Sequence, residues 1–192
     1  MMRTKKQILF ILLALVAAVV LIGCSIHASK DERGKDKDVD IRTPFGSLSV
    51  HKGSGDAKDT GLPLYPGARL KSGSDHDDNA NVNISSSMFG LKVVAQKFES
   101  DDSSDKVLGF YEKQMGKYGS VISCSGGNMN VRFRRHDKDD PVSCDGHSGH
   151  DYDKELKVGT ENNQHVVAVK SSSRGSEFTV VYVRAWDNKD TI

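Results

Sequence analysis

The sequence lacks a strong charge of either sign. Among 192 residues, 27 lysines and arginines nearly balance 26 aspartates and glutamates, and the formal net charge is +1. Removal of residues 1–23 would take away Arg3, Lys5 and Lys6 and no acid, which leaves 24 basic and 26 acidic groups, a net charge of −2. A nucleic-acid-binding protein needs a basic surface that attracts phosphate. We therefore expect no nucleic-acid partner.

The signatures of several enzyme classes are also missing. The chain has no P-loop and no dinucleotide-binding fingerprint, and the glycines at 126 and 127 stand alone. The stretch GHSGH contains Ser148, but His150 stands where a nucleophile elbow of the type G-x-S-x-G needs its last glycine. We therefore expect no enzymatic activity and no cofactor.

Only one long apolar run is present, and it lies at the start of the chain. The first seven residues, MMRTKKQ, carry three cations and no acid, and residues 8–22 are apolar throughout. A charged segment followed by an apolar one is typical of a secretory signal. Because positive flanks stay in the cytoplasm, this segment predicts that the rest of the chain is exported.

The end of this run carries a motif of four residues. Leu21, Ile22, Gly23 and Cys24 resemble the lipobox of bacterial lipoproteins. The resemblance implies that the Cys24 Sγ receives a diacylglycerol, that residues 1–23 are a signal peptide cut off before Cys24, and that the new amine receives a fatty acyl chain such as palmitate. Two or three acyl chains anchor a protein stably, whereas a single chain binds a membrane only marginally.

This interpretation predicts a protein of the bacterial cell envelope, anchored to a membrane, with its domain outside the cytoplasm in the periplasm or beyond. Whether the inner or the outer membrane carries it stays open. An alternative is an uncleaved anchor of a single-pass membrane protein, because about 15 to 17 apolar residues lie at the short limit of a membrane-spanning helix.

Cysteine is scarce, and its count fits this location. Lipidation of Cys24 would leave an even pair, Cys124 and Cys144. In an oxidising compartment such a pair closes a disulfide. The loop of about 20 residues would be worth about 3 kcal/mol through the entropy of the unfolded chain. Two unrelated thiols are the alternative.

The remaining sequence predicts a tether and one folded domain. Residues 24–38 are mixed in charge and nearly free of large apolar side chains, which predicts a flexible tether. Residues 39–60 alternate around Pro44 and Gly46 and predict short strand pieces followed by a linker. Residues 61–188 predict a single domain of clustered strands. The expected fold class is α+β, an antiparallel sheet of about five to seven strands with one helix packed on a face.

The helix is expected within residues 100–119. Asp102 or Ser103 can cap its start, and acidic residues fill the first turn, where the helix dipole favours them. The apolar residues of one face recur at helical spacing: Val107, Leu108, Tyr111, Met115 and Tyr118. Gly116 weakens the last turn, and Gly119 can end the helix in a left-handed conformation.

Three further segments carry a second resemblance. VDIRTPFGSLSV, LPLYPGAR and VLGFYEKQMGKYG occur in this order between residue 39 and about residue 124. Together, with their YPGA and FY motifs, they are similar to exported bacterial lipoproteins of the acidobacterial type that have no assigned activity. The resemblance implies a location in the envelope and no particular chemistry.

One loop holds potential metal ligands. CDGHSGHDYD places Cys144, His147 and His150 within reach of a single ion, and a borderline-soft metal such as zinc accepts thiolate and imidazole. A disulfide at Cys144 would consume the thiolate, so we expect no metal site. The sequence thus favours a non-catalytic binding or structural role toward an unknown envelope protein or ligand, with zinc binding through residues 144–153 as the alternative.

Overall fold

The structure is a computed structural model, and it describes residues 24–30, 36–52, 57–71, 79–127, 140–144 and 152–187. The elements before the helix are β1 (Ser25–Lys30), β2 (Asp36–Thr43), β3 (Gly46–Lys52), the short 3-10 helix η1 (Ala57–Thr60), β4 (Arg69–Leu70), β5 (Ala80–Ser86) and β6 (Phe89–Ser100). The helix and the strands after it are α2 (Ser104–Met115), β7 (Ile122–Gly127), β8 (Tyr152–Thr160), β9 (Asn163–Ser172) and β10 (Gly175–Asp187).

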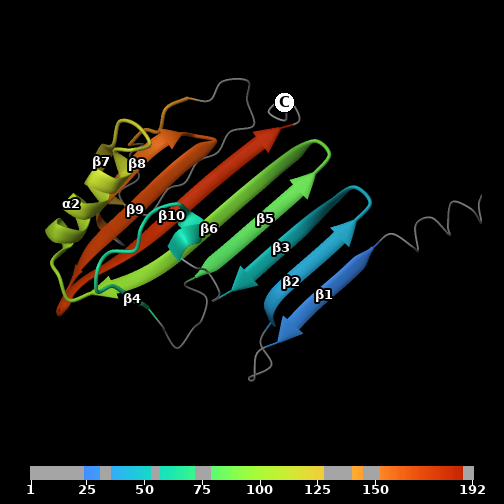
Figure 1. Cartoon of the computed structure of the whole chain (residues 1–192), viewed down its shortest axis with the longest axis horizontal. Coiled ribbons are helices and arrows are strands. Elements are labelled where there is room, and N and C mark those ends of the chain that lie inside the picture. The colour runs from blue at the N-terminus through green and yellow to red at the C-terminus, as the bar shows by residue number, and fades with distance from the viewer. Residues whose placement is uncertain are drawn as a thin grey trace, which may run out of the picture.

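All described strands belong to one antiparallel sheet (Figure 1). The strand order is β1-β2-β3-β5-β6-β10-β9-β8-β7, and β4 pairs with β6 beside this path. The chain meanders from β1 to β6, crosses the sheet through α2 to the far edge at β7, and meanders back until β10 pairs with β6. The α+β class with one helix on an antiparallel sheet is therefore confirmed.

The predicted size of the sheet is wrong, because ten strands replace the expected five to seven. Part of the difference lies in residues 24–38, where the structure has β1 and the start of β2 instead of a flexible tether. The predicted strand pieces within residues 39–60 are likewise joined to the domain, since β2 pairs with β3, and β3 pairs with β5 from Gly46 to Lys52. Ladder hydrogen bonds to a neighbouring strand offset the low apolar content of these segments, which the composition alone did not reveal.

The helix is confirmed, with an earlier end than expected. Ser103 is its N-cap, in extended backbone, and the four buried positions are Val107, Leu108, Tyr111 and Met115. The helix ends at Met115 before Gly116, because glycine is a poor helix former. Tyr118 therefore lies beyond the helix, and Gly119 has a φ of 140°.

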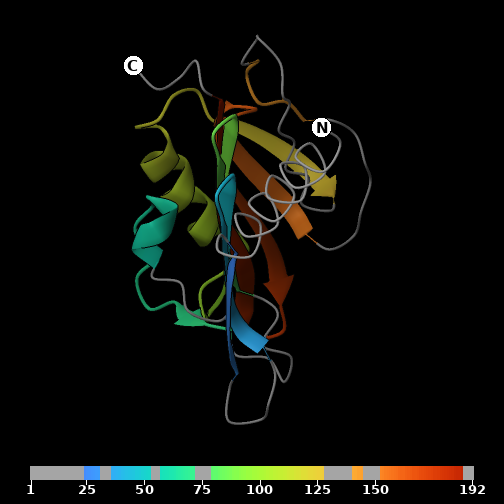
Figure 2. The same cartoon turned by 90° about the vertical axis from the view of Figure 1, so that its right-hand side faces the viewer.

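The helix packs on one of the two faces of the sheet. Figure 2 shows the sheet edge-on, with α2 on one side of it. On the face that bears α2 and η1, here called the helix face, one cluster of apolar side chains fills the space between helix and strands. Its members from the sheet are Phe98, Leu156, Val158, Val167, Val169, Phe178 and Val180. The alternate residues point to the opposite face, here called the far face. A smaller cluster lies there around Val166, Val181 and Val183.

The four strands β1, β2, β3 and β5, here called the ribbon, extend the sheet beyond the helix (Figure 1). Among the described elements, α2 contacts β8, β9 and β10, and η1 contacts β6 and β10. The ribbon's apolar side chains Val39, Ile41, Leu48, Val50, Val82 and Ile84 are only partly buried. The register aligns all six on the far face, while the helix face of the ribbon is polar. Residues 130–135, NVRFRR, alternate in a pattern that predicts another strand, and they lie outside the described residues.

Candidate functional site

The predicted lipid-attachment residue lies at the beginning of the sheet. Cys24 is a free cysteine with an exposed side chain. The next residue, Ser25, pairs with Arg42 of the neighbouring strand, so β1 starts directly after the cysteine. A group attached to the Cys24 sulfur would therefore sit at the edge strand of the folded domain, with no intervening tether.

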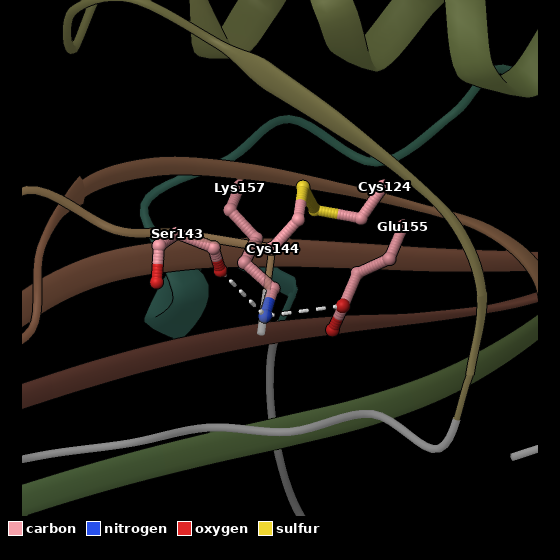
Figure 3. The surroundings of a disulfide bond; sticks show 5 residues. All are labelled: Cys124, Ser143, Cys144, Glu155 and Lys157. Carbon is pink, nitrogen blue, oxygen red and sulfur yellow. Dashed lines mark hydrogen bonds and ion pairs between the residues drawn. A yellow bond between two sulfur atoms is a disulfide. The ribbon is translucent and has the colours of Figure 1, made fainter. Parts of the chain in front are cut away.

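The predicted disulfide is present. Cys124 of β7 and Cys144 are bonded, with their Cα atoms 5.5 Å apart. Figure 3 shows the bridge above the buried side chain of Lys157, whose Nζ lies 3.2 Å from a carboxylate oxygen of Glu155 and 3.5 Å from the carbonyl oxygen of Ser143. The disulfide and the hydrogen bond from Lys157 to Ser143 hold the same short segment, residues 140–144, on the far face.

Backbone contacts hold the rest of this segment against the sheet. The Val142 N–H donates to the Gly159 carbonyl at 3.2 Å, and the Glu161 N–H donates to the Asp140 carbonyl at 2.8 Å. Pro141 forms an isolated bridge with Thr160. Residues 140–144 are thus fixed along the end of β8 by bonds that do not depend on the disulfide.

The disulfide also affects the predicted zinc ligands Cys144, His147 and His150. Because the Cys144 sulfur is bonded to Cys124, it offers no thiolate to a metal in this structure. His147 and His150 lie outside the described residues. Within the described ranges, no three residues of the metal-binding types come together.

The YPGA and FY motifs lie against each other. The Tyr65 ring packs edge-on against Phe110, with ring centroids 5.2 Å apart, and the Tyr65 N–H donates to the Tyr111 hydroxyl at 3.3 Å. The Tyr65 hydroxyl in turn donates to Asp102 at 2.9 Å, just before the helix. Burial raises the pKa of Tyr111 above its usual range, so this hydroxyl stays neutral. These motif residues therefore join the turn to the helix as part of the core.

Arg69, which ends the same motif, makes ion pairs at the surface. Its guanidinium donates to both carboxylate oxygens of Asp101 at 3.0 and 2.8 Å and to Glu99 at 3.3 Å. These bonds hold the pKa of Asp101 below its usual range. Because all three side chains are exposed, water screens the pairs and their contribution to stability is small.

A buried histidine is the most perturbed group that the sequence analysis missed. The ring of His165 lies between those of Tyr118 and Tyr182, at centroid distances of 4.2 and 4.8 Å. Burial lowers its pKa to about 4, although a hydrogen bond with the Thr60 backbone opposes the shift. The side chain is therefore neutral at physiological pH. Its only sequence signal is a position at the start of the apolar run HVVAVK.

A glycine allows the chain to close over this histidine. Gly61 has a φ of 73°, which glycine adopts without strain, and a Cβ there would come within 3.2 Å of the His165 Nε2. The Tyr118 hydroxyl donates to the Gly61 carbonyl at 2.6 Å, so the tyrosine whose ring contacts His165 is also bonded to this glycine. The arrangement packs a neutral imidazole into the domain as a structural element.

Comparison of the chain with protein-family models, with curated proteins and with solved structures gave no match. In the part of the chain that the structure describes, no helix has the length and apolar character needed to cross a membrane.

Proposed function

We propose that this chain is a lipoprotein of the bacterial cell envelope, anchored through Cys24, whose sheet domain has a non-catalytic binding or structural role outside the cytoplasm. The observation that carries the proposal is the position of Cys24. It follows the lipobox residues directly, its sulfur is free, and it is exposed at the first strand of the domain. A thiol at this position is accessible to a modifying enzyme before and after folding.

The other two cysteines support an extracytoplasmic location. Disulfides persist in oxidising compartments and are rare in the cytosol. The Cys124–Cys144 pair also ties β7, the last strand of the sheet, to residues 140–144, and so adds a covalent bond at an edge. A protein exposed to the conditions of the envelope benefits from such a bond.

The proposal is tested by metabolic labelling with an alkyne analogue of palmitate. We expect label on the full-length wild-type chain and none on Cys24→Ala. The matched control is the double variant Cys124→Ala with Cys144→Ala, which should keep the label because it leaves the lipobox intact. Equal labelling of wild type and Cys24→Ala would overturn the proposal.

The mass of the intact protein separates the proposal from an uncleaved anchor. A lipoprotein would lack residues 1–23 and carry the added mass of a diacylglycerol and of any acyl group at the new amine. A single-pass protein would retain residues 1–23 and carry no lipid. The two alternatives place the domain on the same side of the membrane, so fractionation alone does not distinguish them.

A further inference from the structure

The exposed apolar side chains of the ribbon lie at one end of its strands. Phe45, in the β2–β3 turn, is 82% exposed, and Met88, in the β5–β6 turn, is 73% exposed. Ile26, the second residue of β1, is 70% exposed. Large apolar side chains exposed to this degree at adjacent hairpin turns favour contact with an apolar partner.

The register brings these turns and Cys24 to the same end of the sheet. Ser25 pairs with Arg42, Gly46 pairs with Ser86, and Ser85 pairs with Gly90. Figure 1 shows the start of β1, the two turns and the end of β10 side by side. With strands about 4.8 Å apart, the β5–β6 turn lies about 15 to 20 Å from the start of β1.

At this end, here called the tip end, the two hairpin turns carry no charged residue. Residues 43–50 and 79–91 contain no acidic or basic residue, although 28% of the chain is charged. Charged groups are costly to bring into the apolar interior of a bilayer, whereas apolar side chains enter it and aromatic side chains are enriched at its interface. The composition of the two turns thus matches a lipid surface.

The opposite end of the central strands is strongly charged. Beside the end of β6, Arg69 pairs with Asp101 at 2.8 Å. Lys71 and Lys170 both pair with Glu177, at 2.7 and 3.2 Å. The domain is therefore polarised along the direction of its strands, from two uncharged turns at the tip end to an end rich in ion pairs, and only these turns are suited to lipid.

Both turns also satisfy the backbone amide of the exposed residue. The Phe45 N–H donates to the Thr43 hydroxyl at 3.2 Å, and the Met88 N–H donates to the Ser86 hydroxyl at 3.2 Å. The transfer of a backbone N–H out of water costs less free energy when the N–H is already hydrogen-bonded than when it is unpaired. The same local device, a hydroxyl two residues before the apolar side chain, thus prepares both turns for a water-poor surface.

An aromatic residue lies just behind the turns. Trp186 of β10 pairs with Gly90, and a Cβ at Gly90 would clash with the indole ring, so the ring lies across the glycine. Tryptophan is enriched where membranes meet water, because its ring is apolar and its N–H is polar. It is also the only tryptophan in the chain, which makes it a natural fluorescent reporter near this end.

We infer that the tip end is a membrane-contacting surface, on which Phe45 and Met88 enter the interface of the bilayer to which Cys24 is anchored. The inference rests on the proposed function, because lipid on Cys24 brings this end to the membrane. The two turns then add contacts beyond the anchor and set the domain upright, with the charged end pointing away. The occupant is the lipid bilayer rather than another protein.

The test places a single tryptophan at chosen positions of the full-length protein, purified from membranes and reconstituted into phosphatidylcholine vesicles with brominated acyl chains. In a Trp186→Phe background, Phe45→Trp and Met88→Trp probe the tip end. The matched control is Leu70→Trp, because Leu70 is also apolar and exposed, at 41%, but pairs with Phe98 near the opposite end of β6. Palmitate labelling of each variant is measured in parallel.

We expect bromine to lower the emission of the two tip tryptophans about twofold, because a side chain at the boundary of headgroups and acyl chains contacts brominated lipid. The tryptophan at position 70 should keep its emission. Labelled protein whose tip tryptophans are not quenched would overturn the inference and leave the lipoprotein proposal standing. Equal quenching at all three positions would also overturn it, because the domain would not stand upright.

Two other outcomes are informative. Tip tryptophans that stay in a water-like environment on vesicles, but shift to the blue when envelope proteins are added, would assign the surface to a protein partner and overturn the inference. Absence of palmitate label on every variant would overturn the proposed function and this inference with it.

Discussion

The half of the sheet under α2 and the ribbon both place apolar residues at alternate positions along a face, but they differ in burial. In the covered half, Phe178, Val167 and Val158 have no exposed surface. In the ribbon, Ile41 and Val50 alternate just as regularly, yet they are only partly buried. Alternation therefore decides which face of a strand is apolar, whereas burial depends on a second layer that packs on that face.

The largest loss of stability is expected when a large side chain is removed from the centre of the covered half. Phe178 stacks on Phe98 at 5.4 Å and also contacts Tyr65 and Tyr111. Phe178→Ala should lower the free energy of unfolding by about 4 kcal/mol, because it removes a large buried ring and leaves a cavity. Urea denaturation followed by circular dichroism measures this change. A loss below about 1 kcal/mol would contradict the assignment of Phe178 to the core.

Removal of the disulfide should cause the next largest loss of stability. Replacing both Cys124 and Cys144 by serine should lower the free energy of unfolding by about 3 kcal/mol, since the unfolded chain regains the entropy of a loop with sequence separation 20. Cys24→Ser is the control and should leave stability unchanged, because this residue is exposed and unpaired. Equal stability of the double variant and wild type would show that the backbone bonds of residues 140–144 suffice.

The buried histidine predicts an acid sensitivity of the covered half. Since the pKa of His165 is about 4 in the folded protein and 6.5 when unfolded, the unfolded chain binds the proton more tightly. Stability should therefore fall as the pH drops through 6.5 toward 4, by about 2 kcal/mol between pH 7.5 and 5.

His165→Phe should remove this part of the pH dependence while keeping an aromatic ring between Tyr118 and Tyr182. The measurement is urea denaturation of both proteins at pH 7.5 and pH 5. Parallel pH profiles would mean that other groups cause the loss, and the histidine would then not be the sensor.

The smallest loss of stability is expected from a substitution in the ribbon. Ile41→Ala should cost about 1 kcal/mol or less, because the side chain is only partly buried and its removal exposes little new apolar surface. Amide hydrogen exchange should likewise be faster in β2 and β3 than in β9, whose central residues are buried on both faces. Equal protection of the two regions would indicate that the ribbon is covered in solution.

The covered half was predictable from the sequence to a greater extent than the ribbon. The helical spacing of Val107, Tyr111 and Met115 specified the helix and its buried face, and the even count of later cysteines specified their pairing. The ribbon was underestimated because residues 24–38 are rich in charge and Pro44 with Gly46 interrupts the next segment. These segments form strands because they pair with neighbouring strands, and the amino-acid composition does not encode this pairing.

The candidate sites divide in the same way. The predicted lipobox is a local motif, so the sequence alone was sufficient to propose Cys24 as the lipid-attachment residue. The role of Tyr65 in joining the turn to the helix was not visible, because its partners Phe110 and Tyr111 lie more than 40 residues along the chain. His165 was missed for the same reason, since its stacking partners come from two other segments.

By itself, the sequence determined the strand and helix periodicities, the apolar face of each element and the cysteine pair, because each depends on residues close together in the chain or on a simple count. Only the tertiary structure decided that Phe45 and Met88, 43 positions apart, lie at one end of the sheet beside Cys24. The physical reason is register: hydrogen bonds between strands align turns that no local pattern relates.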